Sequence, residues 1–161
     1  SSWRSDSCDA RGLRLRSVVA GDKRSICIRR KGDTMAEAKF YRCKHCGNIV
    51  LMVDEECSCV PHCCGDPMEL LVPGAVDAAV EKHVPSLVRE GNRLNVKVGE
   101  VAHPMTEAHY IQWIAFVSSR KTVIRHLSPE DAPEARFCVE DGEDATVYAY
   151  CNLHGLWKAE G

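Results

Sequence analysis

The sequence predicts an all-β protein in which a small metal-bound unit is followed by a β-sandwich. Five runs in the later part of the chain have the composition of short strands, with turn residues between them: Arg93–Val98, His109–Ser118, Thr122–Leu127, Ala135–Val139 and Thr146–Tyr150. Many short strands without long helical periods are typical of a sandwich. Upstream, cysteines cluster in a segment too short to bury a core of its own, so a metal is expected to stabilise it.

The run His109–Ser118 indicates an inner strand of this sandwich. Apolar residues occupy both alternating sets of positions, with Ile111 and Trp113 on one face and Ile114 and Phe116 on the other. Both faces of the strand are therefore expected to be partly buried. Further upstream, Asp77–Glu81 suggests a brief helical turn.

The cysteine-rich segment predicts a compact unit over residues 35–72. Ile49–Val53 is a short apolar strand after the first cysteine pair, and Gly65-Asp66-Pro67 is a turn signal after the second. The four sulfur ligands expected here, a set that suits iron or zinc, are Cys43, Cys46, Cys63 and Cys64. Because adjacent cysteines cannot both reach one metal with relaxed geometry, Cys63 and Cys64 should distort the tetrahedron.

The C-terminal boundary of this unit is predicted from a turn signal. Val72-Pro73-Gly74 contains two turn-forming residues, which places the sandwich at residues 73–161. Cys57 and Cys59 lie in the intervening loop and are alternative ligands. No role is assigned to Cys8, Cys27 and Cys138, because their spacing in the sequence does not match a metal-ligand motif.

Composition indicates a soluble globular protein of the cytoplasm. The chain is 45% hydrophobic and 27% charged, and it contains ten cysteines. Cysteine pairs with nearby histidines indicate metal binding in a reducing compartment rather than disulfides. No apolar run approaches the length of a membrane span, and we expect no secretory signal because the basic start is not followed by an apolar stretch. We expect neither a membrane nor a nucleic acid as a partner.

Residues 1–34 differ in composition from the rest of the chain. They contain nine Lys and Arg residues against four Asp residues, a net charge of +5, whereas the whole chain carries −2. With no regular hydrophobic period, this segment is expected to be disordered and outside the fold. One hypothesis makes Met35 the true start; the alternative is a basic transit or nucleic-acid-binding arm.

Histidines and one cysteine form a second candidate metal site in the C-terminal half. The five candidate ligands are His83, His103, His109, Cys151 and His154. His103 precedes a proline and is therefore biased towards an extended backbone. In a straight strand His103 and His109 would lie roughly 20 Å apart, so both can bind one metal only if Pro104–Ala108 folds back as a loop. Structural zinc is the competing interpretation, but five ligands are one more than a closed tetrahedral zinc site uses.

These motifs closely resemble those of the desulfoferrodoxin and neelaredoxin superoxide reductases. The resemblance covers about Ala38 to Glu160. It rests on Glu81-Lys82-His83-Val84-Pro85, His103-Pro104-Met105 with His109 and Trp113, Cys151-Asn152-Leu153-His154-Gly155 with Trp157 and Lys158, and the upstream cysteines with Gly65-Asp66-Pro67-Met68. It implies a desulforedoxin-like domain followed by an immunoglobulin-like sandwich.

The resemblance implies two iron cofactors and one-electron reduction of superoxide to hydrogen peroxide, as a defence against oxygen radicals in an anaerobe or microaerophile. One iron is bound by Cys43, Cys46, Cys63 and Cys64. The other takes four equatorial imidazoles, from His83, His103, His109 and His154, with Cys151 as the axial thiolate. By analogy, Lys82 attracts superoxide and helps to deliver protons, and Glu81 occupies the open iron position in the oxidised state.

The partners implied by the resemblance are superoxide, rubredoxin or a similar small electron donor, and a second copy of the chain in a homodimer. The four-cysteine site is expected to be structural and to relay electrons. Two other functions remain open at this point: an electron carrier that uses this site alone, and a zinc-stabilised binding module.

Overall fold

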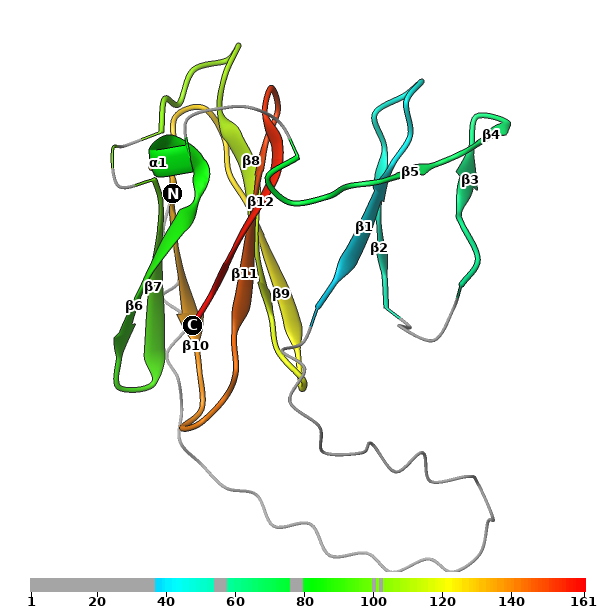
Figure 1. Cartoon of the computed structure of the whole chain (residues 1–161). Helices are drawn as coiled ribbons and strands as arrows, with labels where there is room; N and C mark the ends of the chain where they lie inside the picture. Colours follow the sequence, from blue (N-terminus) through cyan, green and yellow to red (C-terminus); the bar gives the residue numbers. More distant parts are fainter. Residues whose placement is uncertain (1–36, 54–57, 76–79, 100, 102) are drawn as a thin grey trace, which may run out of the picture. The chain divides into compact units, whose positions relative to one another are not determined.

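The structure, a computed structural model, describes residues 37–53, 58–75, 80–99, 101 and 103–161, with only the backbone of Val80 and Glu81 (Figure 1). The predicted extension over residues 1–34 lies outside the described residues, as do Met35, Cys8, Cys27 and Cys57. The predicted boundary between residues 72 and 73 stays a prediction.

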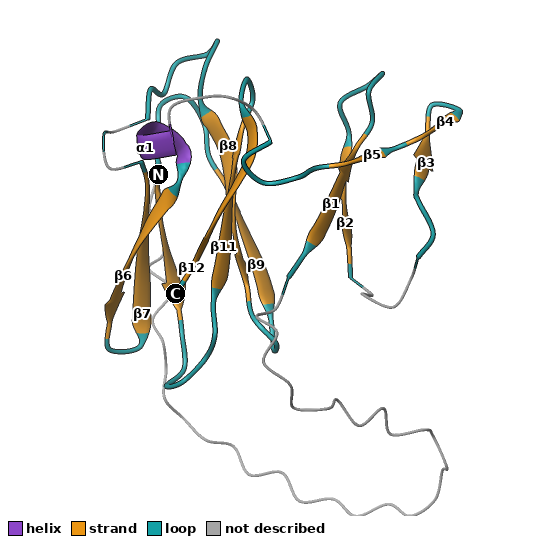
Figure 2. Ribbon diagram, viewed as in Figure 1, coloured by secondary structure: helices purple, strands orange, loops and turns teal. Residues whose placement is uncertain are grey.

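The larger part of the fold is a β-sandwich of two antiparallel sheets (Figure 2). One sheet has the order β10-β7-β6, formed by Glu134–Cys138, Arg93–Val98 and Pro85–Glu90. The other has the order β12-β11-β8-β9, formed by Gly155–Glu160, Thr146–Cys151, Ile111–Val117 and Thr122–His126. The predicted all-β fold is confirmed, and β8 is an inner strand as its pattern indicates.

The two inner strands of the four-stranded sheet, β8 and β11, are buried on both faces, which explains why all six residues of β11 are buried. Along β11, Val147, Ala149 and Cys151 belong to the core between the two sheets. The alternate residues Tyr148 and Tyr150 face a second apolar cluster on the opposite side. This period of two places the Cys151 side chain in the sandwich core at the end of its strand.

A β-bulge interrupts the pairing of β8 and β11 next to Cys151. Tyr150 is opposite Trp113 but Cys151 is opposite Ile111, so Gln112 is the extra residue. Bulges redirect side chains and are common beside functional sites. Here the bulge lies where the chain leaves the sheet towards His109 on one strand and His154 on the other.

The small unit contains two short antiparallel arrays. The first has the order β2-β1-β5, formed by Ile49–Met52, Lys39–Arg42 and Glu69–Leu70, and the second pairs β3, His62–Cys63, with β4, Asp66–Pro67. Phe40 of β1 is 1% exposed because it packs on Trp113 and Tyr148, with ring centroids at 5.0 and 5.3 Å. The Ala38 backbone N–H also donates to the Tyr148 hydroxyl, at 3.1 Å.

Helical structure in the described residues is limited to one turn, α1, over Val80–His83. The predicted turn at Asp77–Glu81 therefore overlaps α1, while residues 76–79 lie outside the description. In the part of the chain that is described, no helix is long and apolar enough to span a membrane.

Glu143, at the end of the sandwich where β8 meets β9, is a buried carboxylate with three partners. It accepts hydrogen bonds from the Ser118 hydroxyl at 2.7 Å and the Glu140 backbone N–H at 2.9 Å, and Lys121 Nζ lies at 3.3 Å. Burial alone would raise the pKa of Glu143, but these partners outweigh burial and lower it.

We predict that Glu143→Gln destabilises the protein by about 1–3 kcal/mol near neutral pH, because it removes the charge that these donors stabilise. A lowered pKa contributes stability above the ordinary glutamate pKa, which is lost as the pH falls through the folded-state value. The difference in unfolding free energy between wild type and variant should therefore shrink in acid. Denaturant titrations across this pH range measure it, with exposed Glu130→Gln as the control. A difference independent of pH would contradict the assignment.

Candidate metal centres

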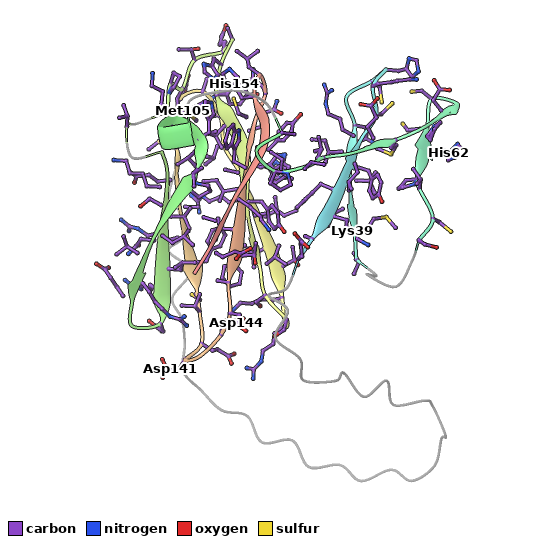
Figure 3. The ribbon with its side chains drawn as sticks, in the orientation of Figure 1. Lys39, His62, Met105, Asp141, Asp144 and His154 are labelled. Carbon is purple, nitrogen blue, oxygen red and sulfur yellow. The ribbon has the colours of Figure 1, made fainter. Side chains whose placement is uncertain are left out.

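Nine predicted ligands gather into two groups, each with its ligand atoms within 4.8 Å of one another. The first group contains His83, His103, His109, Cys151 and His154. His83 ends α1, His103 and His109 lie in the loop before β8, and Cys151 and His154 flank the turn between β11 and β12. Figure 3 labels His154 and Met105 at one end of the sandwich, with Asp141 and Asp144 at the other.

The four imidazole rings form a closed cycle. Neighbouring rings around the order His83, His103, His109, His154 have centroids 4.5–4.8 Å apart and are inclined by 75–79°. His83 and His109 lie across the cycle at 6.2 Å, with their planes inclined by only 29°. The four rings surround a common centre, and each is steeply inclined to its neighbours. This arrangement suits them to bind one metal ion as equatorial ligands.

Two buried nitrogen atoms in this cycle have no hydrogen-bond partner, namely Nε2 of His103 and Nε2 of His109. Nδ1 of His103 lies 2.7 Å from the Pro104 carbonyl oxygen and must donate to it, which leaves a lone pair on Nε2. Burial lowers the pKa of His103 to about 4, so the ring is neutral at physiological pH. A buried, unpaired lone pair is unfavourable unless a cation binds it, so the donor set fits a metal ion.

His83 and His154 complete the cycle with support from Trp157. His83 Nε2 and His154 Nδ1 approach to 2.8 Å. The indole of Trp157 stacks on His83 at 5.0 Å and donates its Nε1–H to the His154 carbonyl oxygen at 3.2 Å. One tryptophan therefore fixes two of the ligand-bearing residues.

Cys151 is the fifth member and is completely buried. Its Sγ lies 3.7 Å from His154 Nδ1. Burial raises the pKa of Cys151, although the backbone N–H groups of His154 and Leu153 act in the opposite direction. A thiolate in this position needs a neighbouring positive charge, which a bound metal ion supplies.

The loop that joins the two histidines before β8 folds back, as their joint ligation requires. Thr106 and His109 exchange backbone hydrogen bonds of 2.9 and 3.0 Å, which closes a tight turn between Pro104 and His109. The prediction that Pro104–Ala108 forms a returning loop is confirmed.

Asn152 links this loop to the cysteine turn, and its role was not predicted from the sequence. Its Oδ1 accepts from the Tyr110 N–H at 3.0 Å, and its Nδ2 donates to the Ala108 carbonyl oxygen at 2.9 Å. The amide thus holds the backbone on both sides of His109. Its position directly after Cys151 was the available signal, but its partners lie more than forty residues away.

Lys82, the predicted steering residue, is exposed on α1 directly before His83. The backbone of Glu81 lies in the same turn, and its side chain lies outside the description.

The second group contains Cys43, Cys46, Cys63 and Cys64. The Sγ atoms of Cys46 and Cys63 are 3.6 Å apart, and those of Cys63 and Cys64 are 3.9 Å apart. The Cys46 backbone N–H lowers the pKa of Cys43 to about 6, whereas the neighbouring Cys46 thiol raises the pKa of Cys63 to about 12. Four sulfur atoms this close cannot all ionise without a cation between them, so this set also fits a metal ion.

Cys64 has an unusual backbone conformation, which accompanies the placement of two adjacent cysteines in one metal-binding group. Its φ of 54° lies in the left-handed region, which is unusual for a residue with a side chain. The expected distortion of the metal's tetrahedron by this pair stays a prediction. Cys59 is not a member of the group, and Cys57 lies outside the described residues.

An ion-pair cluster not foreseen from the sequence joins the two cysteine loops. Asp66 Oδ2 lies 2.6 Å from His45 Nε2 and 3.3 Å from Lys44 Nζ. The hydrogen bond to His45, followed by that to Lys44, lowers the pKa of Asp66. The carboxylate that follows the second cysteine pair therefore bonds to residues between the first pair.

Comparisons with known proteins agree with this geometry. Residues 75–160 match the family model described as Desulfoferrodoxin. A desulfoferrodoxin from Syntrophotalea carbinolica is 49% identical over 79% of this chain and all of its own length, and one from Nitratidesulfovibrio vulgaris is 46% identical over 76% of this chain and 95% of its own.

A solved structure extends the likeness to the fold. The superoxide reductase from Treponema pallidum superposes with a TM-score of 0.65 and 33% identity, covering 76% of this chain and 98% of its own. Nearly the full length of these relatives is thus represented here. The chain belongs to the desulfoferrodoxin family.

Proposed function

We propose that this protein is a superoxide reductase with two iron cofactors. It reduces superoxide by one electron, which together with two protons gives hydrogen peroxide. The observation that carries this proposal is the closed cycle of four imidazoles with the buried Cys151 sulfur beside it. Relatives that are named superoxide reductases, including the one from Treponema pallidum, support it.

The ligand chemistry suits a small anionic substrate. Iron, when bound, supplies a one-electron redox couple and an open coordination position. Neutral imidazoles of the four histidines and the Cys151 thiolate would hold a ferrous ion with a net positive charge, which suits an anionic substrate. The Cys151 thiolate donates electron density, as thiolate ligands do in haem proteins, and its burial keeps water away from the sulfur.

Lys82 provides the positive charge outside the metal. Residues 35–161 carry a net charge of −7, given −2 for the whole chain and +5 for residues 1–34. An approaching anion therefore needs a local cationic patch, and such focusing raises association rates by about 10- to 10³-fold. We propose that Lys82 attracts superoxide and organises water for proton delivery, and that Glu81 would be the residue available to bind the iron in its oxidised state.

The four-cysteine centre stabilises the small unit and passes electrons towards the histidine centre. Its sulfur ligands are more accessible, since Cys46 and Cys64 are exposed, which suits electron entry from rubredoxin or a similar small donor. A homodimer in the cytoplasm completes the proposal, in keeping with five cysteines that belong to the two metal-binding groups.

Visible absorption of anaerobically purified protein, with iron and zinc quantified on the same sample, tests the function. Two iron-dependent sets of bands are expected, one of which appears only when the histidine centre is oxidised. Pulse radiolysis then measures the reaction of the reduced protein with superoxide. Full iron loading without superoxide-dependent oxidation of the histidine centre would exclude a reductase and favour an electron carrier.

Lys82→Ala should slow superoxide reduction by about 10-fold at low salt and weaken its dependence on ionic strength, because the attracting charge is lost. Iron content should not change, since Lys82 is no ligand. The control is Arg93→Ala, which removes one positive charge at the far end of β7. Equal rates for wild type and Lys82→Ala at low salt would refute the steering role.

Cys151→Ser should abolish the absorption band of the oxidised histidine centre and stop superoxide reduction. A serine hydroxyl stays protonated where a thiol would ionise, so the electron-donating ligand is lost. The bands of the four-cysteine centre should persist and serve as the internal control. Retention of the oxidised-centre band would show that Cys151 is not its sulfur ligand.

A further inference from the structure

The chain turns at Gly99, between the end of β7 and the loop that leads to His103. Gly99 is buried and has a φ of +81°, in the region that favours glycine. Its N–H donates to the Val84 carbonyl oxygen at 3.1 Å. Gly99 thus contacts the segment that follows His83.

The space around Gly99 is occupied by backbone. A Cβ at this position would lie 2.5 Å from the Lys82 carbonyl oxygen, 2.5 Å from the Val101 carbonyl oxygen and 2.8 Å from the Lys82 carbonyl carbon. These distances are shorter than real Cβ contacts, and backbone atoms cannot rotate away as the end of a flexible side chain can. Any side chain here must therefore displace the Lys82 segment, the Val101 segment or both.

Other glycines with a similar backbone lack this crowding. Gly142 has a φ of +70° and Gly91 a φ of +57°, and a Cβ at either position would meet nothing within 4 Å. The left-handed conformation alone therefore does not distinguish Gly99. Gly99 is distinguished by its contact with two segments that lead to ligands, those of Lys82 and Val101.

We propose that Gly99 is a positioning residue of the histidine centre. It allows the end of α1 to pack against the loop to His103, and so sets the spacing of the His83 and His103 rings, now 4.8 Å between centroids at 77°. The same contact fixes the backbone of Lys82. This role rests on the proposed function for its effect on superoxide, but its effect on the metal centre is independent of it.

His83 cannot easily compensate for a shift of α1. Its side chain is 3% exposed, stacks on Trp157 and approaches His154 to 2.8 Å. A displacement of the Lys82 carbonyl therefore changes the direction from which His83 reaches the centre. Supporting groups around a metal commonly alter its affinity by about 10- to 100-fold when they are changed.

The test compares Gly99→Ala with Gly142→Ala in full-length protein loaded anaerobically with iron. Both variants put a Cβ on a left-handed residue, but only the first places it against backbone. Four quantities are measured: iron per chain, the absorption bands of the two centres, the thermal unfolding midpoint, and the rate of reaction with superoxide.

We expect Gly99→Ala to weaken iron binding at the histidine centre by about 10-fold or more and to shift its oxidised-state band. The bands of the four-cysteine centre should remain, and the unfolding midpoint without iron should match that of Gly142→Ala. Gly142→Ala should keep the wild-type band and iron content at both centres.

Two outcomes would overturn the proposal. If the two variants bind iron equally, Gly99 serves only the local turn. If Gly99→Ala alone fails to fold or loses both centres together, Gly99 supports the fold as a whole. Wild-type protein that binds both irons but does not react with superoxide would refute the proposed function, while the iron measurements would still decide the role of Gly99.

Discussion

The rest of this structure depends on one constraint: five electron-rich donor atoms lie close together in a buried space. Two imidazole nitrogens there have no hydrogen-bond partner, and a fully buried sulfur lies beside them. Such a set is unfavourable without a cation, because burial penalises unpaired polar groups and thiolates. Metal binding and ordering of the segments that carry His83, His103 and His109 are consequently coupled.

The sandwich makes this convergence possible because its strands provide fixed starting points for the segments that carry the ligands. Cys151 is the last residue of a strand buried on both faces, and the bulge opposite it redirects the chain. Around that fixed point, Asn152 holds the loop of His109 and Trp157 holds His83 and His154. The ligands are thus positioned by hydrogen bonds of Asn152 and Trp157 and by the stacking of Trp157 on His83.

Much of this arrangement was predictable from the sequence because it depends on local pattern. The strand Arg93–Val98 was predicted with its observed bounds, and the neighbouring runs were placed to within two residues. The ligand sets followed from residue types that metals prefer, and the returning loop followed from Pro104 and the distance between two histidines. Resemblance to a known family then supported the assignment of all five residues of the histidine group to one metal ion.

The remaining features could not be predicted from the sequence because they depend on contacts between segments that are distant along the chain. The β6 strand, Pro85–Glu90, has no clear alternation, since four of its six residues are exposed on an edge strand of the smaller sheet. Asn152 and Asp66 look like ordinary turn residues until their partners are known. Gly99 resembles any turn glycine, because the carbonyl groups that crowd it can be found only in three dimensions.

Phe40 packs on a face of the four-stranded sheet where Trp113, Tyr148 and Tyr150 gather. This aromatic face makes the sandwich depend on the small unit. Removal of the small unit would leave three large aromatic rings in contact with water and favour aggregation. A sandwich without the small unit would need other residues, or another chain, to cover those rings.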